Sequence, residues 1–133
     1  MKVHLDTNKI RMISLFQKLT GAHVLDSLEN DNIYFVVAKG DYGLAVGKNG
    51  SKIKNAEKVF KKPIKLFEYS PDLDTFIKNM IPETKEIIKK DDDIEVRIAG
   101  SDRAKVIGRA GYKVKVIHYF LKRLHDVENF KVK

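Results

Sequence analysis

The chain repeats itself at an offset of 61 residues, and this repeat constrains the fold more than any other feature of the sequence. Thirty pairs couple residues 33–62 to residues 94–123, and eight of them are identical, which is more than chance provides. The identical pairs are Ile33/Ile94, Ala38/Ala99, Asp41/Asp102, Gly47/Gly108, Gly50/Gly111, Lys52/Lys113, Lys54/Lys115 and Lys61/Lys122. The repeat predicts two copies of one structural unit, a first domain at residues 1–70 and a second at 71–133.

Apolar spacing and turn residues predict one order of elements for both copies: helix, strand, strand, short helix, longer helix and strand. In the first copy, Asp6 or Thr7 caps a helix that ends at Gly21. Strands are expected at 22–29, 33–39 and 64–69. The apolar stripe expected on the first helix consists of Ile10, Met12, Ile13, Leu15, Phe16 and Leu19.

The second copy follows the same pattern. A helix is expected between Ser70-Pro71-Asp72 and Pro82, and strands at 83–90, 94–99 and 127–132. Asp41 and Asp102 are expected to cap the two short helices. On the longer helices, apolar residues recur at helical spacing. They are Ile53, Ala56 and Val59 or Phe60 in the first copy, and Val114, Ile117, Phe120 or Leu121, and Leu124 in the second.

Positive charge is concentrated in two windows of equal length. The chain has a formal net charge of +8. Residues 39–65 hold eight lysines against two acidic residues, and residues 97–123 hold eight basic residues against Asp102 alone. Residues 71–96 instead carry eight acidic residues and four lysines. Two separate blocks of one sign favour a surface that binds a polyanion, although basic residues kept for solubility are the simpler alternative.

Each basic window contains two glycines separated by two residues, Gly47-Lys48-Asn49-Gly50 and Gly108-Arg109-Ala110-Gly111. Such glycines let the backbone turn sharply and let another chain approach closely. The amides at the start of the following helix favour phosphate oxygens, and Lys48 and Arg109 add charge at the same loop position. Beside the loops, four apolar residues are predicted to form the floor of a groove that accepts unstacked bases. These are Val46, Ile53, Ile107 and Val114.

The residues at 46–53 and 107–114 resemble the signature of KH domains, Val/Ile-Gly-x-x-Gly-x-x-Ile/Val, whose GxxG loop holds about four nucleotides. The helix-first order is similar to the type II KH topology. The resemblance implies an α+β fold of two tandem KH domains, each with a three-stranded mixed sheet and helices packed on one face. It implies RNA contacts from both GxxG tetrapeptides and from Lys52, Lys54, Lys113 and Lys115. Independently of the resemblance, Tyr112 directly follows Gly111 at the junction of loop and helix, where its ring would lie beside a bound nucleotide; packing within the protein is the alternative.

The whole chain also resembles the short archaeal NusA-like transcription termination proteins. This resemblance implies that the protein binds single-stranded RNA during transcription elongation, termination or antitermination, with RNA polymerase as a further partner. Single-stranded DNA remains an alternative ligand, because no residue type here identifies a reader of the 2′-hydroxyl. A KH-type ribosomal RNA-binding or ribosome-assembly factor would share the fold, and so would a scaffold that docks a protein with one copy.

The sequence offers little evidence that the protein is an enzyme. A Walker loop needs four residues between its glycines, whereas Gly43 and Gly47 enclose three, and GxGxxG is absent. The run Asp91-Asp92-Asp93 falls on a predicted turn, without a second carboxylate cluster to complete a metal site. With no cysteine, thiol catalysis and thiolate metal sites are excluded. We expect no enzymatic activity, no cofactor, no metal and no small-molecule substrate.

The protein is expected to be cytoplasmic and to have no membrane partner. The longest apolar stretches, such as residues 33–38, are far shorter than the roughly 18–20 residues that cross a bilayer. The N-terminal residues bring Asp6 where a secretory signal needs an apolar core.

Overall fold

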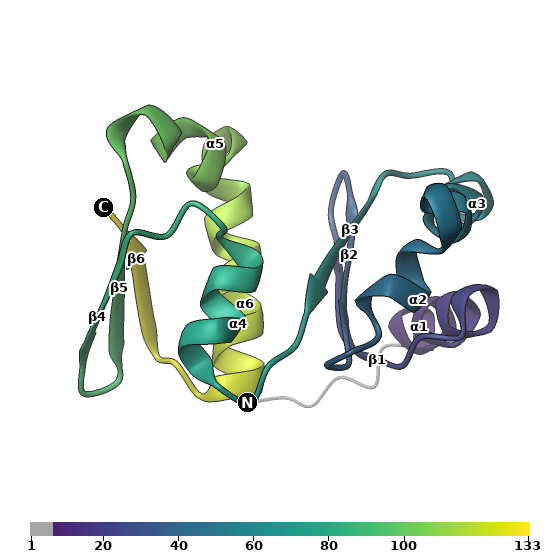
Figure 1. Ribbon diagram of the computed structural model, residues 1–133, viewed down its shortest axis with the longest axis horizontal. Coiled ribbons are helices and arrows are strands. Elements are labelled where there is room, and N and C mark those ends of the chain that lie inside the picture. The colour runs from purple at the N-terminus through teal and green to yellow at the C-terminus, as the bar shows by residue number, and fades with distance from the viewer. Residues whose placement is uncertain (1–6) are drawn as a thin grey trace. The chain divides into compact units, whose positions relative to one another are not determined.

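The computed structural model describes residues 7–133. These residues form two compact units, and the boundary between the units in the sequence lies between Ser70 and Pro71. Both units have the same order of elements, and in each the helices cover one face of a three-stranded sheet (Figure 1). The first unit contains α1 (Thr7–Thr20), β1 (Val24–Glu29), β2 (Ile33–Val37), α2 (Tyr42–Val46), α3 (Ser51–Phe60) and β3 (Ile64–Glu68). The second contains α4 (Leu73–Met80), β4 (Glu86–Lys90), β5 (Asp93–Arg97), α5 (Arg103–Ile107), α6 (Tyr112–His125) and β6 (Asn129–Val132). The α+β fold and the repeated element order are therefore as predicted.

Both sheets are mixed. In the first unit β2 lies between β1, which is antiparallel to it, and β3, which is parallel. In the second unit β5 lies between antiparallel β4 and parallel β6. A parallel neighbour requires a crossover connection, and the short helix, the glycine loop and the longer helix of each unit form part of that connection.

The core of the first unit lies between the sheet and the helices. Phe16 of α1 stacks on Phe35 of β2 with ring centroids 4.2 Å apart, and both side chains are fully buried. Ile33, Phe35 and Val37 alternate along β2 and join this core, as the two-residue period of a strand requires. Ala45 of α2 and Ala56 of α3 complete it, which anchors both helices that flank the glycine loop.

The predicted apolar stripe of α1 was too broad. Met12, Phe16 and Thr20, spaced by four residues, are buried, whereas Ile10 is 53% exposed and Leu15 is 38% exposed. Positions 10 and 15 lie away from the line through 12, 16 and 20 that faces the sheet. Of the two alternatives in α3, Phe60 packs against the core, whereas Val59 is 46% exposed.

The predicted caps were partly wrong. Asp41 and Asp102 precede α2 and α5 as expected, but neither side chain accepts a hydrogen bond from its helix. Asp41 Oδ2 instead accepts from the backbone N–H of His23 at 2.8 Å, which ties the start of β1 to α2. Asp72 does cap α4, since its carboxylate accepts from the side chain and backbone N–H of Thr75, and these bonds lower the pKa of Asp72. The proposed Asp6 cap lies outside the described residues.

Several strands begin later or end earlier than predicted. The first strand starts at Val24 rather than residue 22, the fourth at Glu86 rather than 83, and the sixth at Asn129 rather than 127. The strand pair β4–β5 is joined at the predicted acidic run, but only Asp91 and Asp92 form the turn, in which Asp91 has a positive φ of 56°, while Asp93 already belongs to β5.

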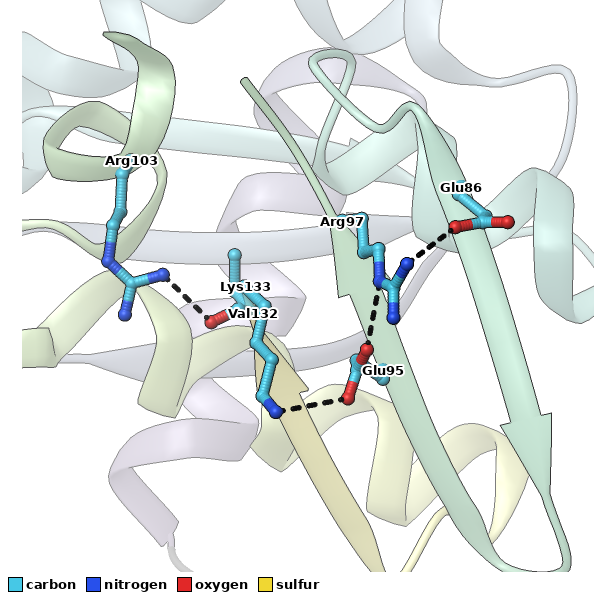
Figure 2. Close-up of polar contacts among 6 residues, drawn as sticks. All are labelled: Glu86, Glu95, Arg97, Arg103, Val132 and Lys133. Carbon is cyan, nitrogen blue, oxygen red and sulfur yellow. Dashed lines mark hydrogen bonds and ion pairs between the residues drawn. The ribbon is translucent and has the colours of Figure 1, made fainter. Parts of the chain in front are cut away.

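The outer face of the second sheet is charged. Arg97 of β5 contacts Glu86 Oε1 at 3.4 Å and Glu95 Oε2 at 3.1 Å, while Lys133 reaches Glu95 Oε1 at 3.7 Å (Figure 2). The hydrogen bond from Arg97 lowers the pKa of Glu95. Ile94 and Val96 alternate with these residues and are buried on the opposite face.

Replacing Phe16 with Ala should lower the free energy of unfolding by roughly 3–5 kcal/mol, because it leaves a cavity against Phe35. Leu15→Ala, the adjacent change on the exposed side of α1, should alter stability by less than about 0.5 kcal/mol. Urea unfolding followed by far-ultraviolet circular dichroism measures both. Equal costs at the two positions would contradict this account of the core.

Candidate nucleic-acid interface

The two glycine loops have the same backbone conformation. In both units the tetrapeptide forms a short 3₁₀ turn that leads directly into the longer helix. At the three loop positions other than Lys48 and Arg109, no pair of corresponding dihedral angles differs by more than 4°. The φ/ψ pairs are 76°/170° and 77°/174° for Gly47 and Gly108, 56°/28° and 54°/25° for Asn49 and Ala110, and 73°/15° and 74°/12° for Gly50 and Gly111.

The first glycine of each loop is required by the protein's own packing. Gly47 and Gly108 combine positive φ with ψ near 170°, a region that is essentially restricted to glycine. A Cβ on Gly47 would lie 2.8 Å from the backbone N of Lys52, and a Cβ on Gly108 would lie 2.7 Å from Lys113 Cβ. The start of the following helix therefore lies directly against the first glycine.

The second glycine of each loop is not crowded by the protein. A Cβ on Gly111 would meet nothing within 4 Å, and one on Gly50 would meet only ordinary contacts, the nearest being Lys54 Cε at 3.5 Å. These positions leave the backbone open to the approach of another molecule. They fit the prediction that the loops accept another chain closely.

The third loop position is left-handed in both units, although the residues differ. Asn49 has φ 56°, which asparagine tolerates well, whereas Ala110 has φ 54°, where a Cβ costs free energy. The second loop is therefore more strained than the first.

Three lysines at the first loop form no ion pair within the described part of the chain. Lys48, Lys52 and Lys54 are exposed, and within residues 7–133 none of them lies within 4.0 Å of an acidic side chain. Lys52 has a structural role as well, because its stem packs over Gly47 and its Nζ donates to the carbonyl oxygen of Thr20 at 3.2 Å. Lys48 and Lys54 are thus the more available of the predicted contacts.

The second loop differs in its surroundings. Arg109 and Ala110 are exposed, and Tyr112, at the start of α6, is 48% exposed with Lys115 Nζ 5.8 Å from its ring centroid. A half-exposed ring beside a lysine is an arrangement that can stack on a base. Its counterpart in the first unit is Ser51, so only the second unit offers an aromatic ring at this position.

An ion pair near the second loop was not predicted. Glu83, between α4 and β4, lies 3.1 Å from Lys105 Nζ of α5. Burial raises the pKa of Glu83, but its own backbone N–H and the charges of Lys105 and Lys113 outweigh this and lower it overall. The partners are 22 residues apart in sequence, and no local pattern connects them.

The predicted groove residues Val46, Ile53, Ile107 and Val114 are all partly buried. They flank the loops in sequence, and Ile53 packs against the core of the first unit. Two apolar side chains on α2 are exposed, Tyr42 at 43% and Leu44 at 51%. Arg103 and Lys105 occupy the corresponding positions in the second unit.

The part of the chain that the structure describes contains neither a metal-binding cluster nor a membrane-spanning helix. Among residues 7–133, no group of three or more histidine, aspartate or glutamate side chains is arranged to hold a metal ion. None of the helices in this part of the chain is long and apolar enough to cross a membrane.

Comparison with known proteins identifies relatives along the whole chain. The chain is 42% identical to a protein of Methanococcus vannielii named "Probable transcription termination protein NusA", with 99% of this chain and 80% of that protein covered. It is 33% identical to a protein of the same name from Methanocaldococcus jannaschii, covering 98% and 75% of the two chains. The crystal structure of APE1850 superposes with a TM-score of 0.77 at 28% identity, over 97% of this chain and all of that chain. No family model matches the chain.

The two glycines of one loop should differ in their tolerance of a side chain. Gly111→Ala should cost roughly 1–2 kcal/mol of stability, because it adds only left-handed strain. Gly108→Ala should cost about 3 kcal/mol or more, because Lys113 must also move. Chemical unfolding of the two variants measures the difference, and equal losses would show that the contact with Lys113 is unimportant.

Exchanging the third loop residues should change stability in opposite directions. Ala110→Asn should stabilise the protein by up to about 1 kcal/mol, since asparagine tolerates the left-handed conformation. Asn49→Ala should destabilise it by a similar amount. Thermal unfolding of both variants provides the test, and a loss of stability in Ala110→Asn would argue against strain at that position.

Proposed function

Because this chain belongs to the archaeal NusA-like family, we propose that it binds single-stranded RNA through its two GxxG loops and acts in transcription elongation, termination or antitermination. Its relatives are named as probable transcription termination proteins, which favours this role over ribosomal RNA binding or ribosome assembly. RNA polymerase is the protein partner we propose with it. The proposed activity is non-enzymatic, needs no cofactor, and takes place in the cytoplasm.

The observation that carries the proposal is the matching geometry of the two loops. At three of their four positions, two loops 61 residues apart have backbone dihedral angles that agree within 4°, and each loop presents a basic side chain, Lys48 or Arg109, at the same exposed position. Packing inside the protein explains the first glycine of each loop but not the second. An open second glycine is what a phosphodiester backbone would require in order to approach the loop.

The roles of the remaining residues follow from their places. Lys48, Lys54, Arg109 and Lys115 would neutralise phosphates, as the salt-dependent part of RNA binding requires. The partly buried Val46, Ile53, Ile107 and Val114 would contact bases, and the exposed Tyr112 ring would stack on one. Lys52 and Lys113 would mainly support the loops, because their stems lie against the first glycines.

Acidic residues in either loop should weaken RNA binding without unfolding the protein. Lys48→Asp/Asn49→Asp and Arg109→Asp/Ala110→Asp place like charge beside phosphate and keep the glycines, and aspartate tolerates the left-handed position. Fluorescence anisotropy should show roughly tenfold or greater loss for the dominant loop at about 0.1 M salt, and a preference of the unmodified protein for single-stranded over double-stranded RNA.

Circular dichroism of each variant controls for folding, and single-stranded DNA of the same sequence tests whether the 2′-hydroxyl matters. A control, Lys78→Asp, changes an exposed lysine of α4 outside both basic windows and lowers the net charge by two units, against three units in each loop variant. If both loop variants bind RNA like the unmodified protein, the loops are structural and the proposal fails. A loss as large in Lys78→Asp would point to net charge instead of the loops.

A further inference from the structure

We propose that Glu83 is a built-in competitor of the RNA phosphate at the second loop: it holds Lys105 in an ion pair, and it thereby makes the second loop the weaker of the two. This inference rests on the proposed function, because it concerns how strongly the same loop binds RNA. It assigns a regulatory role to an acidic residue that lies outside both GxxG motifs.

Glu83 is held in a fixed position. The segment that carries it leaves α4 with a hydrogen bond from Ile81 N–H to the Ile77 carbonyl, and Thr84 bonds the Ile81 carbonyl through both its N–H and its hydroxyl. Lys85 N–H then donates to the carbonyl of Arg97 in β5. The backbone on both sides of Glu83 is therefore secured, and from this position its carboxylate reaches Lys105 Nζ at 3.1 Å.

The side chains on either side of the ion pair are very differently exposed. The Glu83 side chain is 14% exposed, while the Lys105 side chain is 71% exposed and stands three residues before Gly108. The lysine is therefore accessible to an approaching phosphate, but its ammonium lies 3.1 Å from the carboxylate. Lys113, whose stem covers Gly108, also lies within the field of Glu83.

The first unit lacks both members of this pair. At an offset of 61 residues, Glu83 corresponds to Ala22, which is buried, and Lys105 corresponds to Leu44. The lysine equivalent to Lys113 is Lys52, and it faces a neutral carbonyl oxygen instead of a carboxylate. The counter-charge is thus a feature of the second loop alone among the described residues.

A phosphate that binds the second loop must share or displace the carboxylate at Lys105. A lysine ammonium that a carboxylate already neutralises displaces fewer counterions from the RNA phosphates, so it contributes less to the affinity for RNA. Removing the carboxylate charge should therefore convert Lys105 into an additional phosphate contact.

The experiment measures RNA affinity in the full chain with the first loop made acidic by Lys48→Asp/Asn49→Asp. In this background the measured affinity reports on the second loop. In this background Glu83→Gln should tighten binding of single-stranded RNA about fivefold near 0.1 M salt, and the slope of log affinity against log salt should become steeper by about 0.7, the value for one added contact. The same set of substitutions is also measured with the first loop intact.

Two further variants separate this role from net charge. Glu86→Gln removes an equal charge from the ion pair with Arg97 on the outer face of the sheet (Figure 2), and it should change affinity by less than about twofold. Lys105→Gln combined with Glu83→Gln should cancel the gain. Thermal unfolding of each variant confirms that the fold is kept.

The outcomes distinguish this inference from the proposed function. If the unmodified protein binds RNA through its loops, but Glu83→Gln does not gain affinity or gains no more than Glu86→Gln, the competitor role of Glu83 is overturned. If neither loop variant affects RNA binding, the proposed function itself has failed. A gain that survives removal of Lys105 would also overturn the assignment, because the added contact would lie elsewhere.

Discussion

The close approach between the first glycine of each loop and the helix that follows it determines the geometry of both sites. A side chain on Gly47 or Gly108 has no room, because the backbone or stem of Lys52 or Lys113 already occupies the space. This contact aligns the loop with the first turn of α3 or α6. The outward position of Lys48 or Arg109 and the open second glycine both follow from that alignment.

Around this shared framework the two copies have diverged in their side chains. The first unit surrounds its loop with lysines and with the exposed Tyr42 and Leu44, whereas the second has Arg103 and Lys105 at those two positions and adds Glu83 and Tyr112. Arg103 donates to the carbonyl oxygen of Val132, so part of the added charge is committed to holding α5 to β6 (Figure 2). Two loops with the same backbone conformation can therefore bind one ligand with different affinities.

The sequence predicted the parts of this structure that depend on local pattern. Element order, a turn at Asp91 and Asp92, and the places of both glycine loops followed from spacing and turn chemistry. The face of α1 was less predictable, because Ile10 and Leu15 are as apolar as the buried Met12 and only contact with the sheet separates them. The function of Asp41 and the pair Glu83–Lys105 depend on residues 18 and 22 positions away, which no local pattern reveals.

The place of the parallel strand also affects the order in which each unit can form. The hairpin β1–β2 joins neighbours across a short turn, whereas β2 meets β3 through the pair Ile33 and Ile64, 31 residues apart, and β5 meets β6 through Asp93 and Asn129, 36 residues apart. Contacts between distant residues close later than local ones because the intervening chain must first lose entropy. The glycine loop lies inside that intervening chain, so its conformation is coupled to the late step of folding. A substitution that disfavours the loop conformation is therefore expected to slow assembly of the sheet, in addition to changing the surface around the loop.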